Sequence, residues 1–368
     1  MTHPDLLAIL DLARWAPSGD NTQCWRFEIV DETRFAIHGW DTRDWCVYDL
    51  DGHASQIAIG ALLETIAIGA SVQGFRAEFT RCVDCPESRP TIDVTLIEAP
   101  EMLPDPLAEV IERRVTQRRP LSTTPLSEAQ KHALEASVGS NFRVLWLEGA
   151  LNRWRMAKLL FLSARIRLTI PEAYEVHRRV IEWHARYSED KIPDQAIGMD
   201  RMGMRLMRWA MQSWGRVLFL NRWVAGTWLP RLQLDLLPGY YCGAHALIAS
   251  NAQLDGTDAY IAAGRAVQRF WLTATVQGLQ FQPEMTPLIF SHYAREERRF
   301  SIIESAVREA SSVYSRMCAL FPHDAVCAGV FICRIGGGDT PLSRSIRLPL
   351  ERLIDNELPT VNVDTSGL

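Results

Sequence analysis

The sequence lacks the short glycine-rich and serine motifs that decide the chemistry of many enzymes. Gly336-Gly337-Gly338 is neither a G-x-G-x-x-G before a helix nor the start of a P-loop, so no Rossmann nucleotide fold is predicted. No G-x-S-x-G is present, which leaves serine hydrolase chemistry without support. The pair Cys82 and Cys85 is a lone C-x-x-C, whereas a structural zinc site needs about four ligands. We therefore predict no metal site.

Long apolar runs, a secretory signal and an excess of basic charge are also absent. No stretch reaches the ~18 uninterrupted apolar residues of a membrane helix, and no basic region precedes an apolar core near residue 1. Eight cysteines in 368 residues are too few for a disulfide scaffold. The net charge of −5 argues against a nucleic-acid partner. Because hydrophobic residues make up 47% of the chain, we expect a folded protein. Because no secretory signal is recognised, we expect it in the cytoplasm.

Apolar periodicity predicts a mixture of helices and strands along the chain. The predicted helices span residues 6–13, 54–74, 128–137 (with Ser127 as N-cap) and 262–278, and a charged helix precedes residue 113. The predicted strands span residues 25–30, 35–38, 91–97, 142–147 and 330–335. Residues 151–250 are predicted to be helical throughout and are rich in Arg, Trp and Met.

The turn at residues 17–23 joins a predicted helix to a predicted strand. Its backbone N–H groups, hydroxyl and amide could bind a polar planar ligand by its edge. An ordinary turn built on Ser and Asn side chains is the more frequent explanation of such a sequence.

A basic run at residues 113–119 holds four arginines in seven residues. If the segment is extended, Arg114, Thr116 and Arg118 point to the same side. Guanidinium forks match phosphate oxygens, so these side chains would form a small anion site. The alternative is that these arginines form a basic surface exposed to solvent. The spacing of the residues alone favours this alternative over an anion site.

Further arginines lie among Met and Trp residues in the middle of the chain, at Arg201, Arg205, Arg208, Arg216 and Arg222. A basic, aromatic helix can lie on a membrane surface, cap a pocket or pack on a second subunit. We favour the interpretation that these helices pack in the core or cover a pocket, because apolar stripes on helices are usually buried.

Two histidines, His177 and His184, are seven residues apart and would share one helical face. We interpret them as ordinary histidines rather than metal ligands, because isolated pairs rarely complete a ligand set.

Several segments resemble motifs of the FMN-dependent nitroreductase family. Residues 12–27 (LARWAPSGDNTQCWRF) resemble its A-x-x-A-P-S-x-x-N-x-Q-P-W-x-F motif, and residues 114–118 (RVTQR) resemble its R-x-S-x-R motif. Residues 272–283 (LTATVQGLQFQP) resemble its L-x-A-x-x-x-G-L helix, and residues 346–351 (IRLPLE) resemble its C-terminal arginine segment. The resemblance covers roughly residues 1–140 and 255–355.

The basic motif follows the A-P-S motif here, whereas it precedes that motif in ordinary members. This order is similar to the Acg-like branch, in which one chain carries two nitroreductase-like halves. Residues 49–53 (DLDGH) and 60–62 (GAL) also resemble segments of that branch.

The resemblance implies an α+β, nitroreductase-like fold: a central, mainly antiparallel sheet wrapped by helices, pseudo-duplicated, with an inserted helical lid. The implied halves are residues 1–105 and 106–368, with the insertion at about 151–250. One chain would then build a site that two subunits normally share, so a monomer and a homodimer both remain open.

The resemblance also implies a residue set for FMN. The phosphate would be held by Arg114, Thr116, Arg118 and Arg347. The ring or ribityl chain would lie against Pro17, Ser18, Gly19 and Asn21, while Met285 and Thr286 would approach the flavin N5 through backbone N–H groups. No side chain is implied as a catalytic acid or base.

Three positions depart from the family pattern. Cys24 replaces a proline, Ser345 replaces a basic residue, and Met285-Thr286 replaces a Glu-Gly pair near N5. The first two changes are expected to adjust the affinity for FMN. The third weakens the expectation that NAD(P)H reduces the flavin directly.

Three functions follow as hypotheses. The first is a nitroreductase-like FMN oxidoreductase that reduces a small organic substrate by ping-pong transfer through the flavin, with NAD(P)H as one candidate electron donor. The second is an FMN storage or sequestering protein whose lid blocks nicotinamide. The third, less favoured, is an interaction or membrane-surface protein dominated by its Trp- and Arg-rich helices.

Overall fold

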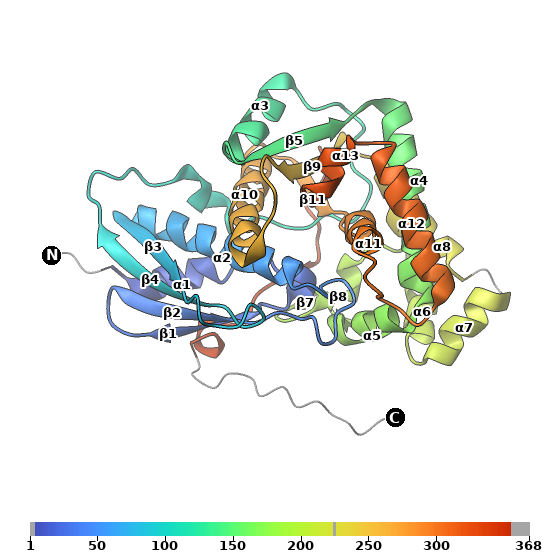
Figure 1. Cartoon of the computed structure of the whole chain (residues 1–368), viewed down its shortest axis with the longest axis horizontal. Helices are drawn as coiled ribbons and strands as arrows, with labels where there is room; N and C mark the ends of the chain where they lie inside the picture. Colours follow the sequence, from blue (N-terminus) through green and yellow to red (C-terminus); the bar gives the residue numbers. More distant parts are fainter. Residues whose placement is uncertain (1–3, 224–225, 355–368) are drawn as a thin grey trace.

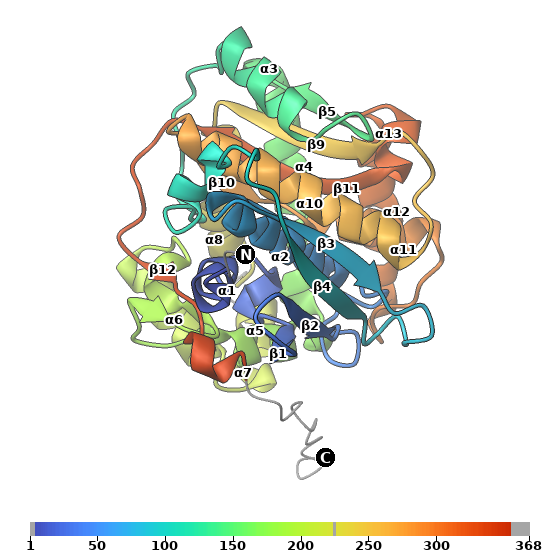
Figure 2. The same cartoon turned by 90° about the vertical axis from the view of Figure 1, so that its left-hand side faces the viewer.

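The computed structural model describes residues 4–223 and 226–354 (Figure 1). Its fold is α+β, but the strands form two separate four-stranded antiparallel sheets instead of the single central sheet predicted from the sequence. The long helices α2 (His53–Val72) and α10 (Gly256–Val276) lie between the two sheets (Figure 2). Because each sheet is covered by its own helix, the strands of one sheet do not reach those of the other.

The first sheet has the order β1-β2-β4-β3 and packs on α1 (Leu6–Ala13) and α2. Its strands are β1 (Trp25–Ile29), β2 (Arg34–Gly39), β3 (Phe75–Arg81) and β4 (Thr91–Glu98). Strand β4 alternates buried and exposed side chains, which is the pattern of a strand with one face on the core. The predicted hairpin of the first two strands is confirmed, with Trp25 opposite Gly39.

The second sheet has the order β10-β11-β9-β5 and packs on α10. Its strands are β5 (Phe142–Leu147), β9 (Ala244–Ser250), β10 (Gln280–Pro283) and β11 (Gly329–Gly336). All seven residues of β9 are buried. The prediction of helix throughout 151–250 was wrong at this strand, because a fully buried strand shows no polar–apolar alternation that would distinguish it from a helix.

The two central helices approach each other at a pair of glycines. A Cβ atom on Gly60 would lie 1.9 Å from the Ile261 carbonyl oxygen, and one on Gly264 would lie 2.0 Å from the Ile57 carbonyl oxygen. Only glycine fits at such a crossing. Beyond the crossing, Glu64 of α2 is paired with two arginines of α10.

The remaining helices surround this centre. They are α3 (Glu128–Ser137), α4 (Gly149–Thr169), α5 (Pro171–Val180), α6 (Arg201–Ala210), α7 (Trp214–Trp223), α8 (Trp228–Arg231), α9 (Leu237–Tyr240), α11 (Thr286–Arg295), α12 (Glu304–Cys318) and α13 (His323–Cys327). Short strand pairs are formed by β6 (Ile181–Glu182) with β8 (Ile192–Pro193) and by β7 (Tyr187–Ser188) with β12 (Arg344–Ser345). The helices α6 to α8 lie at one edge of the molecule (Figure 1).

The prediction of a single helix was confirmed where its sequence marks the helix end clearly. Ser127 caps α3 in a capping box with Gln130, as its sequence predicts. The charged helix predicted before residue 113 was wrong, since only the 3₁₀ turn Pro106–Val110 forms there. The shared helical face of His177 and His184 was also wrong, because α5 ends at Val180 and His184 has a positive φ.

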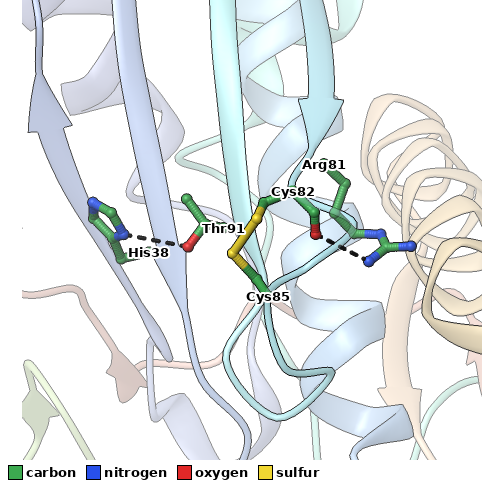
Figure 3. The surroundings of a disulfide bond; sticks show 5 residues. All are labelled: His38, Arg81, Cys82, Cys85 and Thr91. Atoms are coloured by element: carbon green, nitrogen blue, oxygen red, sulfur yellow. Dashed lines mark hydrogen bonds between the residues drawn. A yellow bond between two sulfur atoms is a disulfide. The ribbon is translucent and has the colours of Figure 1, made fainter.

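The lone C-x-x-C forms a disulfide between Cys82 and Cys85 in the loop that joins β3 to β4 (Figure 3). Within the described ranges, α2 is the one helix long and apolar enough to cross a membrane, and 89% of its apolar window is buried in the protein. The structure is therefore that of a globular protein with α2 as a core helix.

Candidate functional site

A single cavity of about 590 Å³ brings together all ten residues predicted to bind the cofactor. They come from four separate segments: Pro17, Ser18, Gly19, Asn21, Arg114, Thr116, Arg118, Met285, Thr286 and Arg347. The volume lies in the range of small-molecule and cofactor pockets, about 300–1,000 Å³. Residues of α2 and α10 line the cavity together with residues of helices α4 to α8.

Two of the predicted phosphate ligands, Arg114 and Arg347, are buried together at this cavity. Arg114 Nη2 donates a hydrogen bond to the Trp15 carbonyl oxygen at 3.0 Å, and Arg347 Nε donates to that of Ala16 at 3.0 Å. Both guanidinium groups thereby hold the chain directly before the turn at residues 17–23. Arg114 also lies over the ring of Trp271, with 4.6 Å from its guanidinium carbon to the ring centroid.

A third arginine, Arg344, completes this cluster and was not predicted. Its Nη2 donates to the Arg114 carbonyl oxygen at 3.1 Å. In the family pattern the basic residue falls at Ser345, so its immediate neighbour Arg344 was not predicted as a ligand. The sequence R-S-I-R at residues 344–347 places a second arginine near Arg347, and this spacing could have pointed to Arg344.

The arginine cluster carries positive charge without a matching carboxylate. No ion pair joins Arg114, Arg344 or Arg347 to an acidic side chain in the described part of the chain. Burial, followed by the charges of Arg347 and Arg344, lowers the pKa of Arg114 well below its usual value. Burial and then Arg344 and Arg14 lower the pKa of Arg347 to about 9. Arg114 and Arg347 are buried cations without an ion pair in the described residues, and Arg344 beside them is half-buried. Such a pair of buried cations is suited to an anion.

The predicted ligand Arg118 lies in a different electrostatic environment. Burial lowers its pKa to about 10, while Asp20 opposes the shift and Arg334 adds to it. Its Nη1 donates to the Ala196 carbonyl oxygen at 3.4 Å. The structure therefore separates Arg118 from the Arg114–Arg347 cluster. Thr116, between them, forms a parallel bridge to Phe281.

The turn at residues 17–23 is held in a strained conformation. Asp20, Asn21 and Gln23 all have positive φ, at 51°, 65° and 46°, which is uncommon for residues other than glycine. Asn21 Nδ2 donates to the Glu189 carbonyl oxygen at 3.0 Å and to that of Ile346 at 3.1 Å. The Asn21 amide therefore fastens the turn to the C-terminal arginine segment, a role the sequence did not predict.

The residues predicted near the flavin N5 lie at the start of a helix. Thr286 is the first residue of α11 and Met285 is its N-cap. The first amide N–H groups of a helix have no acceptor within it, and the helix dipole places positive potential there. This end of α11 can therefore stabilise negative charge on a ligand in the cavity.

A buried ion network supports the floor of the cavity. His245 on β9 lies opposite Arg334 on β11, and both contact Glu284: His245 Nδ1 to Glu284 Oε2 at 2.7 Å, and Arg334 Nη1 to Glu284 Oε1 at 3.0 Å. His245 Nε2 contacts the Gly239 carbonyl oxygen at 2.8 Å, so both ring nitrogens face acceptors. Although burial opposes its charge, Glu284 raises the pKa of His245 to about 10. Arg334 Nη2 donates to the Arg118 carbonyl oxygen at 2.8 Å, which fixes the basic motif.

Several cavity residues carry buried polar atoms that have no partner in the described part of the chain. They are Asn21 Oδ1, Arg114 Nε, Trp271 Nε1, Gln282 Oε1 and Arg334 Nε. A buried polar atom without a partner costs about 1–3 kcal/mol. Donors and acceptors left open around one cavity fit a ligand with an anionic group and a polar ring.

A second polar group at the cavity joins Tyr48 to residues of the helical region 151–250. Tyr48 Oη lies 3.1 Å from His177 Nε2, and Arg167 Nη2 contacts both oxygens of Asp235 at 2.7 and 2.9 Å. Burial and the charge of Arg167 lower the pKa of His177 to about 3, so its ring is neutral and can accept a hydrogen bond from the Tyr48 hydroxyl. His177 was expected to be an ordinary histidine and the other three residues were not predicted, because no local spacing connects them.

Another polar group at the cavity has the chemistry of metal ligands. The ligand atoms of Asp51, His53 and His292 lie within 4.8 Å of one another. His292 Nε2 contacts Asp51 at 3.0 Å, and Arg295 Nη2 contacts His292 Nδ1 at 3.2 Å. Because arginine can only donate, Nδ1 accepts this bond and the ring proton lies on Nε2. That tautomer directs a proton, not a lone pair, toward the centre of the group.

Comparisons with known proteins leave the family open. No protein-family model matches the chain, and no curated protein matches its sequence.

Proposed function

We propose that the chain is a cytoplasmic FMN-binding oxidoreductase of the nitroreductase family that passes reducing equivalents to a small organic acceptor. The proposal takes its family from the motifs at residues 12–27 and 114–118. The observation that carries it is the pair Arg114 and Arg347, which forms no ion pair with a carboxylate among the described residues. Both arginines line the same cavity as the motif turn and the start of α11.

In this proposal, side chains hold the cofactor rather than take part in the chemistry. Arg114 and Arg347 bind the phosphate, and Asn21 Oδ1 accepts a hydrogen bond from a ligand N–H group. The start of α11, at Met285 and Thr286, donates backbone N–H groups to the ring. The helices of the insertion limit the access of water. Bound FMN supplies the electron and hydride transfer itself.

FMN storage is the second candidate, and one observation favours it. Residues of α6 and α7, among them Met207 and Leu220, line the same cavity as Met285 and Thr286. Helices that close the ring side of a flavin site would exclude a nicotinamide. The two functions therefore differ in whether a reductant can reach the bound cofactor.

The visible spectrum of the purified chain, followed by anaerobic NADPH titration, tests the proposal. An oxidoreductase should show oxidised-flavin bands that NADPH bleaches and an added nitroaromatic or quinone acceptor restores. Bleaching by dithionite but not by NADPH or NADH favours storage. A colourless protein that takes up no added FMN contradicts both functions.

A further inference from the structure

The insertion contains an unusual segment of one charge sign. Residues 201–234 hold six arginines and no acidic residue, in a chain whose net charge is −5. The arginines are Arg201, Arg205, Arg208, Arg216, Arg222 and Arg231. This segment forms α6, α7, α8 and the first residues of the π-helix Leu232–Leu236.

The same segment exposes large apolar side chains. On α6, Met202, Leu206 and Trp209 follow the spacing i, i+4, i+7 and share one face, and all three are exposed. On α7 and α8 the exposed side chains are Leu218, Phe219, Trp223 and Trp228, with Trp223 70% and Trp228 61% exposed. We call these seven side chains, with Arg201, Arg205 and Arg222, the Arg–Trp face.

Helix α7 explains why this face has no partner inside the molecule. Val217, Leu220 and Asn221 line the cavity, whereas Leu218, Phe219 and Trp223 are exposed. With ~3.6 residues per turn, these two sets lie on opposite sides of the helix. The inner side of α7 lines the cavity, and its outer side exposes apolar side chains to solvent.

The arginines of the segment fall into two groups. Arg208 pairs with Asp194 at 2.8 Å, and Arg231 Nε donates to the Phe161 carbonyl oxygen at 2.7 Å. Arg201, Arg205 and Arg222 are exposed and form no ion pair with any residue in the described ranges. Three free cations therefore accompany the exposed aromatic side chains.

We propose that the Arg–Trp face docks on an anionic membrane surface. Tryptophan prefers the membrane–water interface, and basic amphipathic helices bind anionic lipid through combined apolar burial and charge attraction. The complete absence of acidic residues from 201–234 matches the negative surface of such a membrane. This reverses the preference for core or cap packing reached from sequence alone, because the side chains concerned are exposed.

A second copy of the chain fits this face less well. A symmetric dimer contact would place the same patch against itself. Arg201, Arg205 and Arg222 would then meet like charges, and residues 201–234 of the other copy contain no carboxylate to pair with them. The docking proposal does not depend on flavin binding, so either can fail without the other.

Sedimentation of the full chain with lipid vesicles tests this proposal. Vesicles of phosphatidylcholine mixed with phosphatidylglycerol should carry the protein into the pellet, and added salt should release it. Vesicles of phosphatidylcholine alone should bind it far less. Replacing Arg201, Arg205 and Arg222 with Gln should lower partitioning roughly 100-fold, since each basic residue near such a surface contributes about a factor of five.

The matched control removes three exposed arginines outside the segment, at Arg89, Arg113 and Arg308, and should leave partitioning within roughly two- to threefold. A second variant, Phe219→Ser with Trp223→Ser, should weaken binding while the salt dependence remains. Equal loss in both arginine variants, or no binding by the unaltered chain, would overturn the proposal. Concentration-dependent self-association that Trp223→Ser abolishes would overturn it in favour of a dimer contact.

Discussion

Arg114 and Arg347 are buried beside one another and hold the carbonyl oxygens of consecutive residues, Trp15 and Ala16. Backbone carbonyl oxygens stabilise both guanidinium charges, and the Trp271 ring adds a cation–π contact to Arg114. No carboxylate pairs with either arginine in the described part of the chain. In the proposed function, a bound dianion would relieve this repulsion. The arrangement brings the basic motif, the turn motif and the C-terminal arginine segment together at one cavity.

Arg114→Ala should weaken FMN binding by roughly 10- to 150-fold. The change removes a charge-assisted hydrogen bond to phosphate, worth about 1.5–3 kcal/mol. Equilibrium dialysis or fluorescence titration of the apoprotein measures it. The unliganded variant should unfold at the same or a higher denaturant concentration, because a buried uncompensated charge is gone.

Arg113→Ala is the matched control, since Arg113 is adjacent in sequence but exposed. Its FMN affinity should stay within about twofold of the unaltered chain, because an exposed charge contributes little. Equal loss of affinity in both variants would reject the phosphate role of Arg114.

FMN affinity should be greatest between about pH 6 and pH 9. Below about pH 6 the phosphate gains a proton and loses one charge. Arg347 has a pKa of about 9 because burial and Arg344 disfavour its charged form. Above that pH the free protein must take up a proton to bind phosphate, so affinity falls. A titration series across pH checks both limbs, and a flat profile would contradict the buried-cation account.

Gly60→Ala should destabilise the fold by about 3 kcal/mol or more. Its Cβ would lie 1.9 Å from the Ile261 carbonyl oxygen, which is backbone and cannot move alone. Gly69→Ala on the same helix is the control, because there the nearest atom is 3.5 Å away. That variant should be neutral or slightly stabilising, since Ala favours helix. Urea denaturation of both variants measures the difference, and similar stabilities would refute the close helix contact.

Glu284→Gln should cost about 3–5 kcal/mol, because it leaves the buried cation Arg334 without its carboxylate and removes the ionic partner of His245. Glu296→Gln, which removes an exposed pair with Arg295, should cost about 1 kcal/mol or less. Chemical denaturation of the two variants gives both values. A small effect at both positions would show that Glu284 does not stabilise the cavity floor.

The same network predicts how stability depends on pH. The pKa of His245 is about 10 in the folded chain and about 6.5 when unfolded. The stability that His245 contributes is therefore complete below about pH 6.5 and is lost as the pH rises toward 10. The loss approaches ~1.4 kcal/mol per pH unit. In Glu284→Gln this slope should disappear above about pH 6.5, because burial then keeps the His245 ring neutral in the folded chain and the unfolded histidine is neutral in the same range.

The sequence predicted those parts of the fold that local signals specify. Helix α1, the β1–β2 hairpin and the capped helix α3 each have an end signal or an alternation of their own. The division into two sheets could not be predicted, because it depends on which helix covers which strands. Strand β9 was missed because burial on both faces removes its alternation.

The candidate site was predictable only where its residues form short motifs. Arg114, Arg118 and Arg347 belong to such motifs and do line the cavity. Their separation into two electrostatic environments was not predictable, because Asp20 approaches Arg118 only through the strained turn. The pairs Tyr48–His177 and Arg167–Asp235 join residues distant in sequence, so no spacing could reveal them.

The most direct test of the central claim is a calorimetric titration of the purified apoprotein with FMN and, separately, with riboflavin. One FMN should bind per chain, and riboflavin, which lacks the phosphate, should bind at least 100-fold more weakly, since two charge-assisted contacts contribute roughly 3–6 kcal/mol. Equal affinity for both ligands, or binding of neither, would contradict a flavin site built on Arg114 and Arg347.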